Sequence, residues 1–237
     1  MEKGTENKNL ESKGLIASAR HTIIMVGILL IFSISGYLSN TSSGNSISAT
    51  SKIMLYLMVA FGEWALLYYM WVGIKNKKRI SLINLISNKD KLEFKLNDFL
   101  IGFSFWVAAN LILFLVKYLL NLPIVSNSNE NLLPQNYIEY ASFFILSLSA
   151  GFCEEVIYRG YFQKQFTAIF NHKWIAILLQ GILFGISHGY QGIKYVVILC
   201  VYGVLFGLLV HYARNLKPAI VAHSWQDIFS GIIYQGL

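Results

Sequence analysis

Long apolar stretches separated by short polar segments make up most of the chain. Seven of them approach the roughly 20 mainly apolar residues that a membrane-crossing helix needs. They lie at about 23–38, 53–74, 99–120, 140–158, 174–188, 195–213 and 219–237. The pattern predicts an all-α, polytopic transmembrane helix bundle with about seven spans; an eighth, re-entrant segment is the alternative.

Composition narrows the class of protein further. Of the 237 residues, 55% are hydrophobic and only 13% are charged, whereas soluble domains carry about 25% charged residues. This excludes a typical cytosolic enzyme, and it also excludes a disordered chain, which combines low hydrophobicity with high charge. Cys153 and Cys200 both lie in apolar stretches, and two such cysteines indicate neither a disulfide framework nor a Cys-based zinc site.

Lys and Arg are unevenly divided between the predicted loops. Sixteen of the 19 fall in the segments 1–20, 75–95, 159–173 and 214–217. Because cytoplasmic loops carry an excess of these residues, we expect a multi-pass plasma-membrane protein with a cytosolic N-terminus. The net charge of +7 is then a topology signal and a contact with anionic membrane lipid, not with nucleic acid; no oligomeric state is indicated.

The chain divides into three parts on this pattern. We expect a cytosolic N-terminal tail (1–20), a block of N-terminal transmembrane helices and loops (21–136), and a membrane core that carries the chemistry (137–237). The segments 39–52 and 121–139, rich in Asn and Ser, are typical of solvated connectors.

Two glycine pairs are spaced for close contact between helices. Gly181 and Gly185, and again Gly203 and Gly207, have the GxxxG spacing that lets two helix backbones approach. This spacing serves packing within one chain or dimerisation, and we favour packing within the chain.

Ionisable side chains inside apolar spans are costly and are functional candidates. Most of those in this chain fall in its last third. They are Glu63, Lys117, Glu154, Glu155, Arg159, His188, His211, His223 and Asp227. We expect Glu63 to face the bundle and pair with a polar neighbour, and the C-terminal group to form the site.

Two adjacent glutamates begin the candidate site. Glu155 and Arg159 are four residues apart, share one helix face and can pair. Glu154 points about 100° away around the helix axis, and an unpaired carboxylate in an apolar site suits general-base work. The alternative is a simple ion cluster at the cytosolic end of the helix.

Two histidines complete the pattern. His188 follows Phe184 by four residues, and Asp227 follows His223 by four. A carboxylate at that spacing can fix the tautomer and orientation of a histidine. Two such histidines beside an unpaired glutamate favour the activation of a water and the stabilisation of an oxyanion.

Two familiar catalytic motifs are absent from the sequence. It contains no HExxH zinc-protease helix and no phosphate-binding GxxxxGK loop. Ser187 precedes His188, but neighbours in a helix point about 100° apart, so we do not expect a Ser–His dyad.

Three motifs in order carry a family resemblance. Residues 154–159 read EExxxR, residues 184–188 read FxxxH, and residues 223–227 read HxxxD. They resemble the CPBP family of CAAX proteases and bacteriocin-processing enzymes, also called Abi, over about residues 140–231. The resemblance implies an intramembrane endopeptidase that cleaves a membrane-associated substrate, either a CAAX-type prenylated protein or a peptide (bacteriocin) precursor. The alternative is a non-catalytic bacteriocin self-immunity or membrane scaffold protein on the same fold.

The resemblance also implies roles for individual residues. Glu154 is the general base, Glu155 and Arg159 form a supporting ion pair, and His188 positions the water. His223 and Asp227 would stabilise the tetrahedral intermediate. Asp227 stands where many relatives have Asn, and an ionised Asp cannot donate a hydrogen bond, so orienting His223 or binding a metal is the more plausible role for it.

Cofactor and substrate contacts follow from the same resemblance. We expect no cofactor; a zinc ion held by Glu154, His188, His223 and Asp227 is the alternative. Trp225 and Phe184 are expected to line the substrate.

If the helices were straight, the three motifs would lie at different depths in the membrane. His188 would lie ~21 Å from the cytosolic end of its helix and His223 only ~8 Å from the end of its own. The groups meet only if the segment 159–173 is sunk in the membrane or the loop at Pro218 is buried. Irregular backbone at depth is tolerated where it lines a cavity, so we predict a water-filled cavity that opens to the cytosol.

Overall fold

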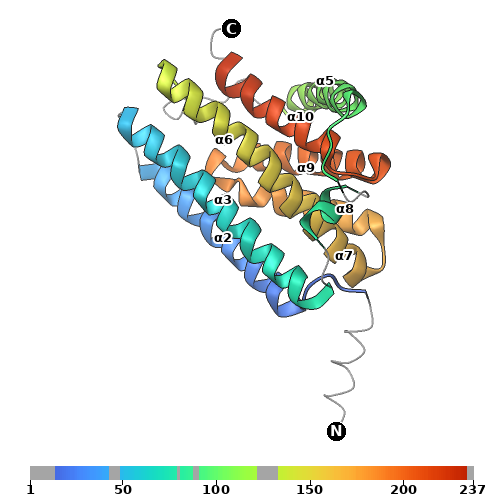
Figure 1. The fold of residues 1–237 in the computed structure, drawn as a ribbon. Helices are drawn as coiled ribbons and strands as arrows, with labels where there is room; N and C mark the ends of the chain where they lie inside the picture. Colours follow the sequence, from blue (N-terminus) through green and yellow to red (C-terminus); the bar gives the residue numbers. More distant parts are fainter. Residues whose placement is uncertain (1–13, 43–48, 79–80, 88–90, 122–132, 234–237) are drawn as a thin grey trace.

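The computed structural model describes residues 14–42, 49–78, 81–87, 91–121 and 133–233. These residues form helices and no strand, which confirms the predicted all-α bundle (Figure 1). The α-helices are α2 (Ala19–Ser42), α3 (Ala49–Lys78), α4 (Leu82–Ile86), α5 (Leu96–Leu119), α6 (Tyr137–Glu155), α7 (Gln163–Phe170), α8 (Lys173–Ser187), α9 (Ile193–Ala213) and α10 (Lys217–Ile228). Shorter turns are η2 (Val156–Phe162), η3 (Gly189–Gln191) and η4 (Phe229–Ile233).

Five helical stretches in this part of the chain are long and apolar enough to cross a membrane. They are Ala19–Leu38, Lys52–Lys77, Leu96–Leu119, Tyr137–Phe170 and Tyr195–Ala213. The predicted fifth and seventh spans correspond to α8 and α10, which have 15 and 12 residues. The fold is therefore a helical membrane bundle, as predicted, but five helical stretches of the described residues, not seven, are long and apolar enough to cross a membrane. The end of the predicted seventh span, 234–237, lies outside the described residues.

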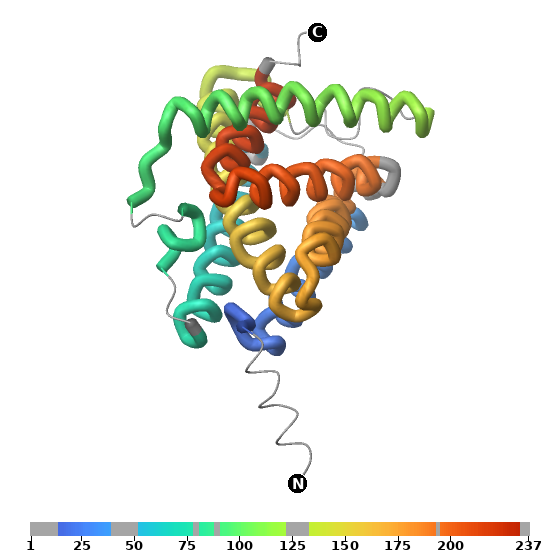
Figure 2. Tube along the Cα trace, turned by 90° about the vertical axis from the view of Figure 1, so that its right-hand side faces the viewer, coloured from blue at the N-terminus to red at the C-terminus, as the bar shows by residue number. Residues whose placement is uncertain are grey.

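The helix α6 runs through the middle of the bundle. Figure 1 shows α2 and α3 side by side on one flank of α6 and α10 on the other. Figure 2 shows α5 along one edge of the molecule, where it packs against α10 and α9. α8 and α9 form a closely packed pair behind α6. This arrangement brings α6, α8 and α10 together at the centre.

The glycine pairs pack helices within the chain, as predicted. A Cβ on Gly181 would meet the backbone of Val204, and one on Gly185 would meet Cys200, so α8 and α9 touch along their glycines. Gly151 of α6 makes a similar approach to Ser224 of α10. Small residues therefore set the close spacing within two helix pairs, α8 with α9 and α6 with α10.

The segment that leads into α10 is buried, which removes the conflict in depth. Leu216 is 1% exposed and its N–H donates to the carbonyl oxygen of Ile86 in α4 at 2.9 Å. Lys217 and Pro218 are buried as well, and Lys217 Nζ pairs with Asp98 Oδ2 at 2.8 Å. The helix α10, which carries His223, therefore begins at a point already inside the bundle.

The chain after Glu155 also stays inside the protein instead of leaving as a loop. η2 is a π-helical turn whose seven residues are all buried, and it continues directly into α7. The start of the segment after Arg159 and the Pro218 segment are thus both buried in the protein, which lets the three motifs meet. Single π-helical turns of this kind are frequent at functional sites.

The last residues of the predicted N-terminal tail pack under α7. Ile16 and Ala17 are buried, and their N–H groups both donate to Gln165 Oε1, at 2.9 and 3.2 Å. Gln165 Nε2 donates back to the carbonyl oxygen of Ala17 at 3.0 Å. Residues 1–13 of the tail lie outside the described residues, as do parts of the predicted connectors.

Candidate active site

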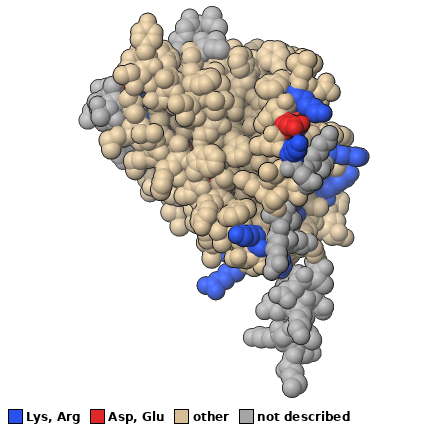
Figure 3. Space-filling model, viewed as in Figure 1, with Lys and Arg blue, Asp and Glu red and all other residues tan. Residues whose placement is uncertain are grey.

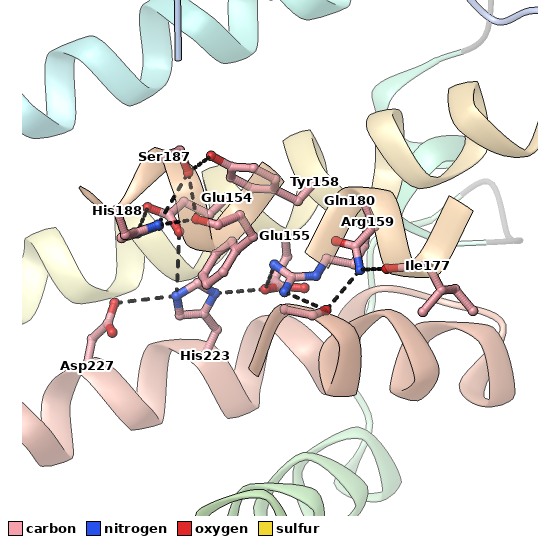
Figure 4. A network of polar contacts seen from close by, with 12 residues as sticks. Glu154, Glu155, Tyr158, Arg159, Ile177, Gln180, Ser187, His188, His223 and Asp227 are labelled. Carbon is pink, nitrogen blue, oxygen red and sulfur yellow. Dashed lines mark hydrogen bonds and ion pairs between the residues drawn. The ribbon is translucent and has the colours of Figure 1, made fainter. Parts of the chain in front are cut away.

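The structure brings all six predicted site residues into one network (Figure 4). Glu154 and Glu155 end α6, and Arg159 lies in η2. His188 caps the end of α8, while His223 and Asp227 are carried by α10. Three segments far apart in the sequence thus meet at one point.

Glu155 is the fully buried centre of this network. Its Oε1 accepts from Arg159 Nη1 at 2.8 Å, which confirms the predicted i, i+4 pair. The same oxygen lies 2.8 Å from His223 Nδ1, a contact that sequence reasoning missed. Arg159 Nη2 donates to the carbonyl oxygen of Gly203 at 3.2 Å, which ties the pair to α9. Glu155 therefore orients His223 through its Nδ1–H as well as pairing with Arg159.

Glu154 has different surroundings from its neighbour. Its side chain is 18% exposed, and it faces the Nε2 atoms of both histidines, with Oε1 3.6 Å from His188 and Oε2 3.7 Å from His223. Oε2 is buried and has no hydrogen-bond partner among the residues that the structure describes. Glu154 therefore keeps an acceptor oxygen open between two imidazole rings.

The tautomer of His188 follows from its backbone partner. Its Nδ1 lies 2.8 Å from the carbonyl oxygen of Phe184, and two acceptors would repel at that distance. Nδ1 must therefore carry a proton, which leaves Nε2 facing Glu154. The ring lies tilted against the ring of Phe184, with centroids 4.5 Å apart, and Phe184 is itself only 2% exposed beneath the two histidines.

Ser187 contacts His188 but does not form a Ser–His dyad with it. Its Oγ lies 3.3 Å from His188 Nδ1, which already carries a proton. The two side chains come this close because His188 ends the helix, with φ −99° and ψ 21°. The Ser187 hydroxyl donates to the carbonyl oxygen of Phe184 at 2.8 Å and so serves as part of the support of the ring.

Asp227 does not orient His223. Its Oδ2 lies 3.9 Å from His223 Nε2, beyond hydrogen-bond distance, and Nδ1 is already held by Glu155. The side chain of Asp227 is 30% exposed. Asp227 thus faces the same side of His223 as Glu154 does, as a second, more distant carboxylate.

The donor types at the site are those that zinc takes, but their arrangement is not a metal site. Imidazole nitrogens and carboxylate oxygens are common zinc ligands, and both histidines have Nδ1 held by an acceptor, as metal-bound histidines do. Within the described ranges, however, no group of three or more His, Cys, Asp or Glu side chains is close enough to hold a metal ion. We therefore derive no step through a metal.

Two further predicted residues lie beside the site. Trp225 is half-buried and packs against the rings of Phe103 and Trp106 of α5. Glu63 accepts from Ser149 Oγ at 3.4 Å, which confirms that it pairs with a polar neighbour inside the bundle.

Residues 136–229 match the family model described as type II CAAX prenyl endopeptidase Rce1-like. Neither the curated proteins nor the solved structures compared with the chain include a match. The matched segment contains all three motifs and every residue of the network in Figure 4. The chain is thus an integral membrane protein whose residues 136–229 are similar to the type II CAAX endopeptidases, which supports the resemblance to the CPBP family.

Proposed function

We propose that the protein is an intramembrane endopeptidase in which Glu154 activates the attacking water. The observation that carries this proposal is the contrast between adjacent glutamates. Glu155 is fully buried and its Oε1 is held at 2.8 Å by both Arg159 and His223. Glu154 is 18% exposed, and its contacts with the two histidines are longer, at 3.6 and 3.7 Å. An open carboxylate beside two imidazoles is what a general base needs.

The reaction can be written with these groups alone. Glu154 takes a proton from water as the water oxygen bonds to the carbonyl carbon of the scissile peptide. The tetrahedral intermediate then collapses, the C–N bond breaks, and Glu154 returns the proton to the leaving amine. His188, with its Nε2 3.6 Å from Glu154 Oε1, orients the water. The net result is addition of one water across one peptide bond.

His223 is placed to stabilise the oxyanion. Its Nδ1 side is held by Glu155 at 2.8 Å, and its Nε2 lies within 4 Å of both Glu154 and Asp227. Surrounding carboxylates favour the doubly protonated imidazole, in which Nε2–H is free to donate to a developing negative charge. Glu155 and Arg159 act through His223 as positioning residues.

The substrate is a peptide or lipidated protein that reaches the site within the membrane. Two classes fit the proposal, a CAAX-type prenylated protein and a peptide precursor such as a bacteriocin. We place the protein in the plasma membrane, in contact with lipid, with its N-terminus in the cytosol. Figure 3 supports this topology, because Lys and Arg on that face gather toward its lower and right-hand edges. Exposed basic residues occur in each predicted cytosolic segment, for example Arg20, Lys75, Lys173 and Arg214.

Cleavage of a reporter by the Glu154→Gln variant tests the proposal. This substitution keeps the shape of the side chain and removes the base, so cleavage should fall by roughly 10²- to 10⁴-fold. The reporters are membrane-anchored peptides with and without a farnesylated CAAX tail, incubated with wild-type or variant membranes. The matched control is Glu63→Gln, the same change at a glutamate that is bonded to Ser149; it should cleave like the wild type at equal membrane abundance.

The same experiment separates the alternatives. Full activity of Glu154→Gln would contradict a catalytic role and favour self-immunity by binding or a scaffold role. Cleavage that a chelator abolishes in the wild type, and that zinc restores, would contradict the metal-free route and assign Glu154, His188, His223 and Asp227 as ligands.

A further inference from the structure

Tyr158 connects the helix of Glu154 to the end of α8. It lies four residues after Glu154 and therefore on the same helix face. Its hydroxyl oxygen lies 2.6 Å from the Oγ of Ser187, which is the residue next to His188 (Figure 4). Neither Tyr158 nor Ser187 is one of the residues that define the three motifs.

The direction of these hydrogen bonds can be assigned. A serine hydroxyl has one proton, and that of Ser187 lies on the carbonyl oxygen of Phe184 at 2.8 Å. Tyr158 O–H must therefore be the donor to Ser187 Oγ. The same carbonyl accepts from His188 Nδ1 at 2.8 Å, and Ser187 Oγ lies 3.3 Å from that nitrogen. Tyr158, Ser187 and His188 thus form one chain of hydrogen bonds that converges on one carbonyl.

Packing supports the same three residues. Tyr158 is 3% exposed, and its ring meets the ring of Phe184 edge to face at 5.0 Å. Phe184 in turn contacts the ring of His188 in a tilted arrangement, with centroids 4.5 Å apart. Replacing Tyr158 by Phe would keep these ring contacts and remove only the hydroxyl, so the hydrogen bond can be tested by itself.

His188 needs support from outside its own helix. It ends α8, and its backbone is followed by the short turn η3. One helical turn of α6 and η2 carries both the base, Glu154, and the hydroxyl that braces the opposite histidine. The separation between Glu154 and His188 Nε2 therefore depends on the contact between Tyr158 and Ser187.

We propose that Tyr158 and Ser187 are positioning residues that hold His188 Nε2 toward Glu154. This inference rests on the proposed function, since it assigns the two hydroxyls to the same reaction. Outer partners of catalytic or metal-bound histidines typically contribute 10- to 100-fold to activity.

The test combines four variants in the reporter assay. Tyr158→Phe and Ser187→Ala should each lower kcat by roughly 10- to 100-fold with little change in KM. The double variant should be no worse than the poorer single one, because the two residues act through one contact. Ser187→Thr, which keeps the hydroxyl, should retain most of the activity. The matched control is Tyr202→Phe, because the Tyr202 hydroxyl is buried yet has no hydrogen-bond partner within the described ranges.

A spectroscopic measurement makes the test independent of cleavage. In detergent micelles with ¹⁵N-labelled histidine, the His188 signals are identified by their loss in His188→Gln. The wild type and Tyr202→Phe should show a single tautomer protonated at Nδ1, and Tyr158→Phe should show a mixture. Wild-type kcat and an unchanged tautomer in Tyr158→Phe would overturn the inference, as would Ser187→Thr behaving like Ser187→Ala. If Glu154→Gln cleaves normally, the proposed function fails, and the ¹⁵N comparison still decides the inference.

Discussion

A glutamate lies inside the bundle near each end of α6, and the two glutamates differ in their hydrogen bonds. At the start, Glu139 is 1% exposed and both of its oxygens are bonded. Oε1 accepts from Asn136 Nδ2 at 2.6 Å, and Oε2 accepts from the backbone N–H of Gln135 at 2.9 Å and from Lys52 Nζ at 3.5 Å. At the other end, Glu154 retains an oxygen with no hydrogen bond in the described part of the chain.

Hydrogen bonding and exposure together separate the structural glutamate from the chemical one, since the side chain of Glu139 is 2% exposed and that of Glu154 is 18% exposed. Lys52, which the sequence placed in a solvated connector, is 3% exposed and joins α3 to the start of α6 through Glu139. Saturated carboxylates of this kind hold helices together. An acceptor left open beside titratable groups is available to a substrate. Glu155 resembles Glu139 in being buried and paired with a cation, although its Oε2 accepts no hydrogen bond from the described residues.

The largest effect that can break the comparison is the loss of a buried glutamate that pairs with a cation. Glu139→Ala and Glu155→Ala should each destabilise the protein by about 3–5 kcal/mol, because each leaves a buried cation without its partner. Thermal unfolding in detergent measures this loss. Only Glu155→Ala should also lower cleavage per folded molecule, since Glu155 holds His223 Nδ1 at 2.8 Å.

Replacing both members of an ion pair distinguishes the effect of an unpaired buried charge from the effect of lost packing. Glu139→Leu with Lys52→Met, and Glu155→Leu with Arg159→Met, remove both charges of each pair and should recover most of the stability. The first double variant should regain full cleavage and the second should not. Equal recovery of cleavage in both would show that Glu155 is no more than structural.

A second, smaller effect is expected at His223. His223→Gln removes the imidazole that faces the reacting carbonyl and should reduce kcat by roughly 10²- to 10³-fold, or about 2.7–4 kcal/mol. KM should change little, because the contact forms chiefly in the transition state. Steady-state cleavage of the best reporter measures both constants. The matched control is His211→Gln on α9, whose ring contacts Lys173 and Trp174 away from the site; a similar loss there would contradict the assignment.

The pattern of apolar residues and the local spacing of polar ones predicted much of the fold and of the site from the sequence. The apolar stretches match α2, α3, α5, α6, α8 and α9 within a few residues, because each is set by local composition. The Glu155–Arg159 pair followed from i, i+4 geometry. Tyr158 could have been found in the same way, since it shares a face with Glu154.

Contacts between distant segments were not predictable in this way. The bond from Glu155 to His223 joins residues 68 positions apart, and it depends on α6 touching α10 at Gly151 and Ser224. The π-helical turn η2 and the buried Pro218 segment likewise arise from tertiary packing. Straight helices therefore predicted a separation in depth that the folded protein does not have.

The smallest expected effect concerns Asp227 and sharpens the comparison at the end of α6 that carries Glu154. Asp227→Asn should change kcat/KM by less than about tenfold, or roughly 1.4 kcal/mol. Asp227 Oδ2 is 3.9 Å from His223 Nε2 and the side chain is 30% exposed, so its charge is partly screened by solvent. The reporter assay at fixed ionic strength measures the change. The matched control, Asp98→Asn, alters a carboxylate bonded to Lys217 Nζ at 2.8 Å and to the backbone N–H of Lys95; it should cost stability and leave cleavage per folded molecule intact. A loss of more than a hundredfold in Asp227→Asn would mean that the Asp227 carboxylate itself is required, as a metal ligand would be. The site at the end of α6 would then contain two carboxylates that take part in the reaction instead of one.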